Sequence, residues 1–416
     1  MYIKNLKFIM FLVLTILAFS LILGFIFTAS YADDSIYVWS DMSKNTSSNI
    51  SNNSIPTTNL LQLESTSAVL IEQSTGQILY SHNMNEKLRP ASVTKVMTVL
   101  LIMEAIDSGK ISLTDIVPCS ENAAAMGGSQ IWLDPQETLT VDEMLKAICV
   151  ASANDCSVAM AEYLAGSESS FVSLMNNRAN ELGMTNTTFK NCHGLDEDGH
   201  ITSSYDISLM SQELLKNHPT ITNYTTIWMD SLRNEKSELI NTNKLIKSYN
   251  GITGLKTGST GLALYNLSAS ATRDNLSLIA VIMKAPSTKI RFSEAQKLLD
   301  YGFNNFSYEE FAKKDEIIKE INITKGLKQS VPVIFEDNSE VLLEKGQKDK
   351  ITQVLSLPDI VQAPIQKGDK IGEVSYILDD KTILTSNLVA GESIDKLNLF
   401  TIFKKVIYSW IDLLRS

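Results

Sequence analysis

The sequence predicts an α/β (α+β) domain followed by a small all-β domain, and three observations support this fold class. Pro90 fits a helix entry and Gly109 a helix end, and the residues between them are mostly apolar, so we expect a buried helix over 92–107. The segment 276–283 is apolar and β-branched, as in a buried strand. Over 308–394, short β-branched segments alternate with turns, which indicates a small β-sandwich.

Ser92 and Lys95 lie at the start of the expected helix. Residues i and i+3 share one helix face, about 5–6 Å apart, so the amine can reach the hydroxyl. A serine hydroxyl needs an adjacent base to become a good nucleophile, and a lysine serves as that base when burial lowers its pKa. The same spacing recurs in the polar segment Ser393–Lys396. A capping serine beside a solvated lysine therefore remains an alternative.

Two later segments match this motif. Ser152 and Asn154 lie between a helix expected over 141–150, which begins with the capping box Thr140–Glu143, and a second helix that ends at Gly166. These two polar residues therefore fall at a junction between helices.

The second segment is Lys256-Thr257-Gly258, which follows the glycine-containing stretch 250–255. It begins a hairpin with arms over about 261–272 and 276–283. Because glycine has no Cβ, Gly258 lets another chain approach the strand edge closely.

Ser-x-x-Lys, a Ser-x-Asn type element and Lys-Thr-Gly form the signature of penicillin-binding proteins and class A β-lactamases. Because it contains these three motifs in this order, most of the chain after residue 63 resembles the serine D-Ala-D-Ala carboxypeptidases, which are the low-molecular-mass penicillin-binding proteins. The resemblance implies a β-lactamase-like transpeptidase domain, with an antiparallel sheet flanked by helices, followed by the β-sandwich. Ala153 departs from it, since relatives commonly carry glycine there. The supporting segments are Arg89–Thr98, Gly127–Gln130, Ser152–Asp155, His193–Asp196 and Gly254–Gly258.

The resemblance also implies roles for three catalytic residues. Ser92 would attack the carbonyl between two D-alanines and form an acyl-enzyme, with Lys95 as its base. Ser152 would bridge Lys95 and Lys256 and relay the proton to the leaving amine, and water would then release the shortened peptide.

Further residues would bind the substrate. Asn154 would contact its amide backbone, while Lys256 and Thr257 would hold the terminal carboxylate. The backbone N–H groups of Ser92 and Ser259 would form an oxyanion hole. Arg291 is either a second carboxylate anchor or an exposed residue on a helix expected over 288–300.

Composition narrows the other possibilities. The net charge of −11 argues against nucleic acid as a partner. The histidines lack metal-ligand spacing, so we expect neither a metal nor a cofactor. His193 is expected in a structural turn. Four cysteines are too few for a disulfide scaffold. Cys149 and Cys156 flank the Ser152 junction, where a bridge is one alternative and buried thiols the other.

The two ends of the chain suggest export and membrane association. Residues 1–32 read as a signal peptide, although the apolar run is long enough for an uncleaved anchor. Near the C-terminus, apolar residues share one helix face, which suits a helix in the interface at the outer face of the cytoplasmic membrane; a helix docked on the protein's own core is the alternative. These apolar residues are Leu399, Phe403, Val406, Trp410, Leu413 and Leu414.

The sequence thus divides into five expected parts, and its expected partners are the peptidoglycan stem peptide, β-lactam antibiotics and that membrane surface. A β-lactamase, a D,D-endopeptidase and a non-catalytic cell-wall peptide-binding protein remain alternatives to a carboxypeptidase. The parts are a signal peptide (1–32), a disordered linker (33–62), a D,D-peptidase domain (63–306), a β-sandwich (308–394) and an amphipathic helix (395–416).

Overall fold

The computed structural model describes residues 61–398 and positions 400, 403, 407, 408, 410 and 411. The expected signal peptide and nearly all of the expected linker lie outside the described residues, as does most of the expected C-terminal helix. Within the described part of the chain, no helix combines the length and apolar character needed to cross a bilayer.

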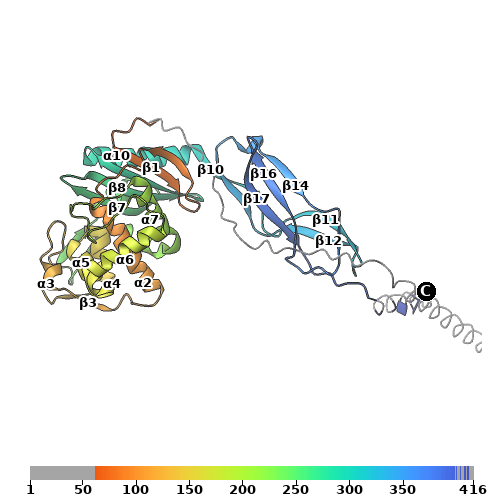
Figure 1. The fold of residues 1–416 in the computed structure, drawn as a ribbon, viewed down its shortest axis with the longest axis horizontal. Coiled ribbons are helices and arrows are strands. Elements are labelled where there is room, and N and C mark those ends of the chain that lie inside the picture. The colour runs from red at the N-terminus through yellow and green to blue at the C-terminus, as the bar shows by residue number, and fades with distance from the viewer. Residues whose placement is uncertain (1–60, 399, 401–402, 404–406, 409, 412–416) are drawn as a thin grey trace, which may run out of the picture. The chain divides into compact units, whose positions relative to one another are not determined.

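A five-stranded antiparallel sheet forms the centre of the first domain, with the strand order β2-β1-β9-β8-β7 (Figure 1). The predicted hairpin is confirmed, because β8 and β9 are joined by a tight turn and pair antiparallel. Lys256 lies within the preceding strand instead of starting the hairpin. The strands are β1 (Ser67–Glu72), β2 (Ile78–His82), β7 (Ile252–Thr260), β8 (Leu264–Arg273) and β9 (Leu276–Ala285).

Alternate residues of the strands enter two different cores, as the period of two in a strand requires. Val69 and Val281 belong to a large cluster with the helices that follow β2, whereas Leu70 and Ala280 pack in a second cluster with α10 (Thr288–Asn305). The sheet is therefore buried on both faces.

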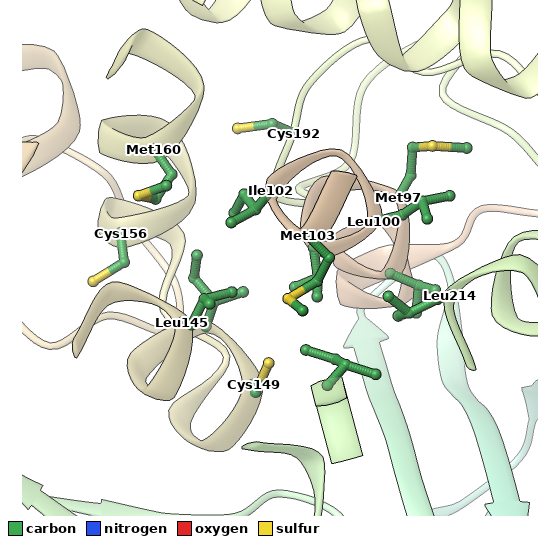
Figure 2. Packing of buried hydrophobic residues seen from close by; sticks show 14 of the residues in the cluster. Met97, Leu100, Ile102, Met103, Leu145, Cys149, Cys156, Met160, Cys192 and Leu214 are labelled. Carbon is green, nitrogen blue, oxygen red and sulfur yellow. The ribbon is translucent and has the colours of Figure 1, made fainter. Parts of the chain in front are cut away.

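The large cluster surrounds α2 (Lys95–Asp107), which contributes Met97, Leu100, Ile102 and Met103 (Figure 2). Nearly every side of this helix is buried, which explains its mostly apolar sequence. The other longer helices of the domain are α5 (Asn154–Ala165), α6 (Glu168–Glu181) and α7 (Ser204–Asn217).

The helix expected over 141–150 is interrupted. Its capping box between Thr140 and Glu143 is present, and α4 (Val141–Lys146) follows. The chain then widens into a π-helical turn, η2 (Ala147–Ala151), which ends at Ser152 in a left-handed conformation. Such turns occur often at functional sites.

Shorter elements complete the domain. They are η1 (Ala91–Thr94), β3 (Ile116–Pro118), α3 (Glu121–Ala124), β4 (Thr138–Thr140), η3 (Pro219–Ile221), α8 (Thr222–Thr225), β5 (Met229–Leu232), β6 (Ser237–Ile240) and α9 (Leu245–Ser248).

The second domain is all-β, as the sequence predicts. A six-stranded sheet has the order β14-β16-β17-β12-β11-β15, and β10 pairs with β13 in a two-stranded sheet. Buried side chains such as Val331, Val374 and Leu388 form its core. Its elements are β10 (Phe306–Ala312), β11 (Ile317–Thr324), β12 (Ser330–Phe335), β13 (Ser339–Glu344), η4 (Lys348–Lys350), β14 (Thr352–Ser356), β15 (Ile360–Gln362), β16 (Lys370–Leu378) and β17 (Lys381–Ala390).

Candidate active site

Lys95 is completely buried at the start of α2, and its amine contacts three oxygen atoms. Its Nζ lies 3.2 Å from Ser92 Oγ, 2.6 Å from Asn154 Oδ1 and 2.6 Å from the carbonyl oxygen of His193. Burial holds the pKa of Lys95 well below its usual value, and the nearby charge of Lys256 lowers this pKa further. Lys95 is therefore suited to be a neutral amine at physiological pH.

The three contacts orient the lone pair of that neutral amine. Asn154 Oδ1 and the His193 carbonyl oxygen are pure hydrogen-bond acceptors. Both lie at short distances from Lys95 Nζ, and each accepts a hydrogen bond from one of the two N–H groups of the neutral amine. The lone pair of the amine then points toward Ser92 Oγ. This geometry suits removal of the proton from the Ser92 hydroxyl.

Strand β7 lies close against the segment that carries Ser92. A Cβ atom on Gly258 would lie 2.9 Å from the carbonyl oxygen of Pro90 and from the backbone nitrogens of Ser92 and Val93. Only glycine allows this approach without displacement of the serine. The sequence interpretation of Gly258 as a position of close approach is consistent with this contact.

Asn266 on β8 fixes the same segment from the neighbouring strand. Its buried amide donates to the carbonyl oxygens of Arg89 and Pro90 at 2.8 and 2.9 Å, and accepts from the Lys284 backbone at 2.7 Å. Sequence reasoning did not single out Asn266. Asn266 lies opposite Gly258 in the β7–β8 ladder. Only a prediction of the pairing register between these two strands could have identified it from the sequence.

Ser152 and Asn154 lie at the η2–α5 junction, as expected, and Asn154 contacts Lys95 from there. Ser152 has a φ of 64° and a buried Oγ without a hydrogen-bond partner among the described residues. The expectation that this hydroxyl bridges Lys95 and Lys256 is therefore wrong for the structure described here. Asn154 donates from Nδ2 to the carbonyl oxygen of Gly127 at 2.7 Å while its Oδ1 faces Lys95. An amide has two donors and two acceptor lone pairs, so one of each remains for a substrate. Ala153, between them, is fully buried.

Lys256 and Thr257 on β7 and Arg291 on α10 bring two cationic side chains and a hydroxyl to this part of the domain. Burial lowers the pKa of Lys256 to about 7, and Arg291 contributes to this shift. Burial also lowers the pKa of Arg291 to about 10. Thr257 Oγ1 lies 2.6 Å from Thr242 Oγ1. Because the charged forms of Lys256 and Arg291 are both destabilised by burial, an anion bound between them would be stabilised.

Arg291 is buried on α10, so the alternative of an exposed arginine is wrong. Its Nη1 donates to the carbonyl oxygens of Gly258 and Asn266 at 3.3 and 3.2 Å. These bonds tie α10 to the two strands that hold the Ser92 segment. Ser259, the expected second oxyanion donor, is the next residue along β7 and is exposed.

The loop after α6 contributes more than the expected structural turn. His193 presents its backbone carbonyl to Lys95, and Gly194 has a φ of 94°. A Cβ on Gly194 would lie 1.9 Å from the carbonyl oxygen of Ala91. Burial lowers the pKa of His193 to about 3. The imidazole is therefore neutral, and it is the peptide backbone that contacts the reactive amine.

All four cysteines are buried free thiols in this structure, Cys149 and Cys156 among them. The described residues contain no cluster of histidine, cysteine and carboxylate side chains suited to a metal ion.

Comparison with known proteins places this geometry in context. Residues 52–287 match the family described as D-alanyl-D-alanine carboxypeptidase, and residues 306–396 match the family described as penicillin-binding protein 5, C-terminal domain. The chain is 44% identical over 357 residues to D-alanyl-D-alanine carboxypeptidase DacF of Bacillus subtilis, covering 85% of this chain and 92% of the relative. It is 34% identical over 341 residues to DacC of Escherichia coli, covering 80% and 84% of the two chains.

Solved structures agree with these sequence matches. Penicillin-binding protein 5 from Haemophilus influenzae superposes with a TM-score of 0.69 at 32% identity, covering 80% of this chain and 98% of that chain. Penicillin-binding protein D2 from Listeria monocytogenes, in the ampicillin-bound form, superposes with a TM-score of 0.54 at 30% identity, covering 58% and 99%.

Proposed function

The chain belongs to the D-alanyl-D-alanine carboxypeptidase family, and on that premise we propose that Ser92 is its nucleophile and Lys95 the base. The protein is a serine-type, penicillin-binding carboxypeptidase that acts on peptidoglycan. The observation that carries the assignment of residues is the buried Lys95 amine, with two acceptors on its N–H groups and Ser92 Oγ in the third direction.

In the proposed acylation, the neutral Lys95 amine takes the Ser92 proton while Ser92 Oγ bonds to the carbonyl carbon between two D-alanines. The carbon–nitrogen bond breaks and D-alanine leaves after its nitrogen receives a proton through Ser152, whose buried hydroxyl has no competing partner among the described residues. Backbone N–H groups of Ser92 and Ser259 hold the oxyanion. Water then attacks the ester, and the serine hydroxyl is restored.

Substrate binding is proposed to use the two sides of the site differently. Lys256, Thr257 and Arg291 attract the terminal carboxylate, since they gather positive charge and a hydroxyl beside β7. Asn154 positions Lys95 and offers its remaining donor and acceptor to the substrate amide. A penicillin would acylate the same serine: the Ser92 Oγ–carbon bond forms, the lactam carbon–nitrogen bond breaks, and the proton goes to that nitrogen.

The test is release of D-alanine from a pentapeptide ending in D-Ala-D-Ala, together with the site of the benzylpenicillin adduct by mass spectrometry. We expect an adduct on Ser92 and none in Ser92→Ala. Ser393→Ala is the matched control, since Ser393 has the same spacing to Lys396 but both residues are exposed. An adduct at another residue would overturn the assignment. Rapid turnover of the antibiotic would indicate a β-lactamase, and adduct formation without D-alanine release a peptide-binding protein.

We also propose that the chain is exported through residues 1–32 and that 395–416 lies on the outer face of the cytoplasmic membrane. The described apolar side chains Phe400 and Phe403 are 74% and 58% exposed, which supports contact with lipid more than docking on the protein's own core. With the leader removed, deletion of 397–416 should release the protein from liposomes. Replacement of Phe403 and Trp410 by serine should do the same, while Arg415→Ser should not. Liposome binding by the deleted form would refute the tail as sole anchor.

A further inference from the structure

The loop that contains Gly127, Gly128 and Ser129 forms a wall of the site beside Asn154. The Asn154 backbone N–H donates to the Ser129 carbonyl at 2.7 Å, and its side chain donates to the Gly127 carbonyl at 2.7 Å. A Cβ on Gly128 would lie 2.8 Å from Asn154 Nδ2 and 3.4 Å from a methyl carbon of Leu195. The loop is thus in direct contact with the residue proposed to bind the substrate amide.

The same loop presents a tryptophan to solvent. Trp132 is 75% exposed, and its backbone has a φ of 54°. A large apolar side chain in water and a left-handed backbone at a non-glycine residue are both unfavourable. Such a combination in a loop that also contacts Asn154 suggests a functional constraint.

Two charged side chains hold Trp132 in this conformation. The fully buried Asp155 carboxylate accepts from the backbone N–H groups of Ile131 and Leu133, each at 3.1 Å. Arg233 donates to the carbonyl oxygens of Ile131 and Trp132 at 2.9 and 3.2 Å. The backbone on both sides of the indole is therefore fixed, and the fixing carboxylate immediately follows Asn154 in the chain.

We propose that Trp132, with the partly exposed Leu195, forms a subsite for an apolar or aryl group on the acyl side of the bond that is cleaved. The inference rests on the proposed function. Lys256 and Thr257 are assigned there to the terminal carboxylate, on the leaving-group side. Because that side of the site is taken by the leaving group, the loop 127–129 beside Asn154 is assigned to the acyl part of the substrate. A flat, rigid indole gives an apolar group a large contact area at little entropic cost.

Two β-lactams that differ only in the acyl side chain test this proposal. Benzylpenicillin carries an aryl side chain, whereas 6-aminopenicillanic acid carries none. The second-order rate constant for acylation is measured for the full chain and for Trp132→Ala, Trp132→Phe and Ile317→Ala. Ile317 is a matched control, because it is 62% exposed but lies on β11 of the second domain.

Trp132→Ala should acylate about tenfold more slowly with benzylpenicillin and within twofold of the unaltered chain with 6-aminopenicillanic acid. Trp132→Phe should recover most of the loss, and Ile317→Ala should react as the unaltered chain does. An equal loss with both compounds, or no loss with benzylpenicillin, would overturn the subsite. Failure of the unaltered chain to acylate at Ser92 with either compound would instead refute the proposed function.

Discussion

Replacing Asn154 by aspartate tests how the site keeps Lys95 neutral. Asn154 Oδ1 lies 2.6 Å from Lys95 Nζ. A carboxylate at that distance attracts an ammonium group by about 6 kcal/mol at an effective dielectric constant of about 20. This attraction raises the pKa of Lys95 strongly. The aspartate variant should therefore hold the amine protonated at neutral pH.

We expect acylation of Asn154→Asp by benzylpenicillin to be about 10³-fold slower or more at pH 7, because the neutral fraction of the base falls tenfold per pKa unit. The rate should rise tenfold per pH unit as the solution becomes alkaline. Stopped-flow acylation between pH 6 and 10 measures both effects.

Asn154→Ala separates this charge effect from the loss of contacts. It also removes the hydrogen bond to the Gly127 carbonyl but introduces no charge. We expect a loss of only about tenfold to hundredfold, without an alkaline shift of the profile. Equal rates and equal pH profiles for the aspartate and alanine variants would refute the idea that Lys95 acts as a neutral base.

Three further predictions concern the strand, the anion site and the helices. Gly258→Ala places a methyl group 2.9 Å from the Ser92 backbone nitrogen, so the rate of Ser92 acylation should fall by about 10²-fold. An unchanged acylation rate would show that β7 can move away from Ser92 without disturbing the site. Because the pKa of Lys256 is about 7, its positive charge is present below that pH and lost above it. The KM for D-Ala-D-Ala peptides should therefore rise between pH 6 and 8, and it should be high and pH-independent in Lys256→Met. Arg178 pairs with Glu104 and Glu213 at 2.7 and 2.5 Å. Arg178→Met should therefore lower the free energy of unfolding, measured in urea, by about 2 kcal/mol. An unfolding free energy equal to that of the unaltered protein within error would show that these ion pairs do not stabilise the fold.

The local elements of the fold were predictable from the sequence because their signals are local. The capping box at Thr140 and the apolar hairpin strand each depend on residues only a few positions apart. The π-helical turn before Ser152 was not predictable in this way. Its residues are buried in the large core, and no residue between 147 and 151 carries a turn signal.

The candidate site was predictable only in part for the same reason. Ser92 and Lys95 are neighbours on one helical segment, whereas the carbonyl of His193 reaches Lys95 from 98 positions away. Every residue has a backbone carbonyl, so this contact is not marked by any residue type in the sequence. The buried position of Arg291 likewise depends on how α10 packs against β7 and β8.

The most direct measurement is the titration of Lys95 itself. Lysine labelled with ¹³C at Cε gives a signal whose chemical shift reports the charge of the amine, and Lys95→Met identifies which signal belongs to Lys95. We predict that the Lys95 signal is that of a neutral amine at pH 7 and that it titrates well below the usual lysine range. A Lys95 signal that remains that of an ammonium group until about pH 10 would contradict the proposed mechanism.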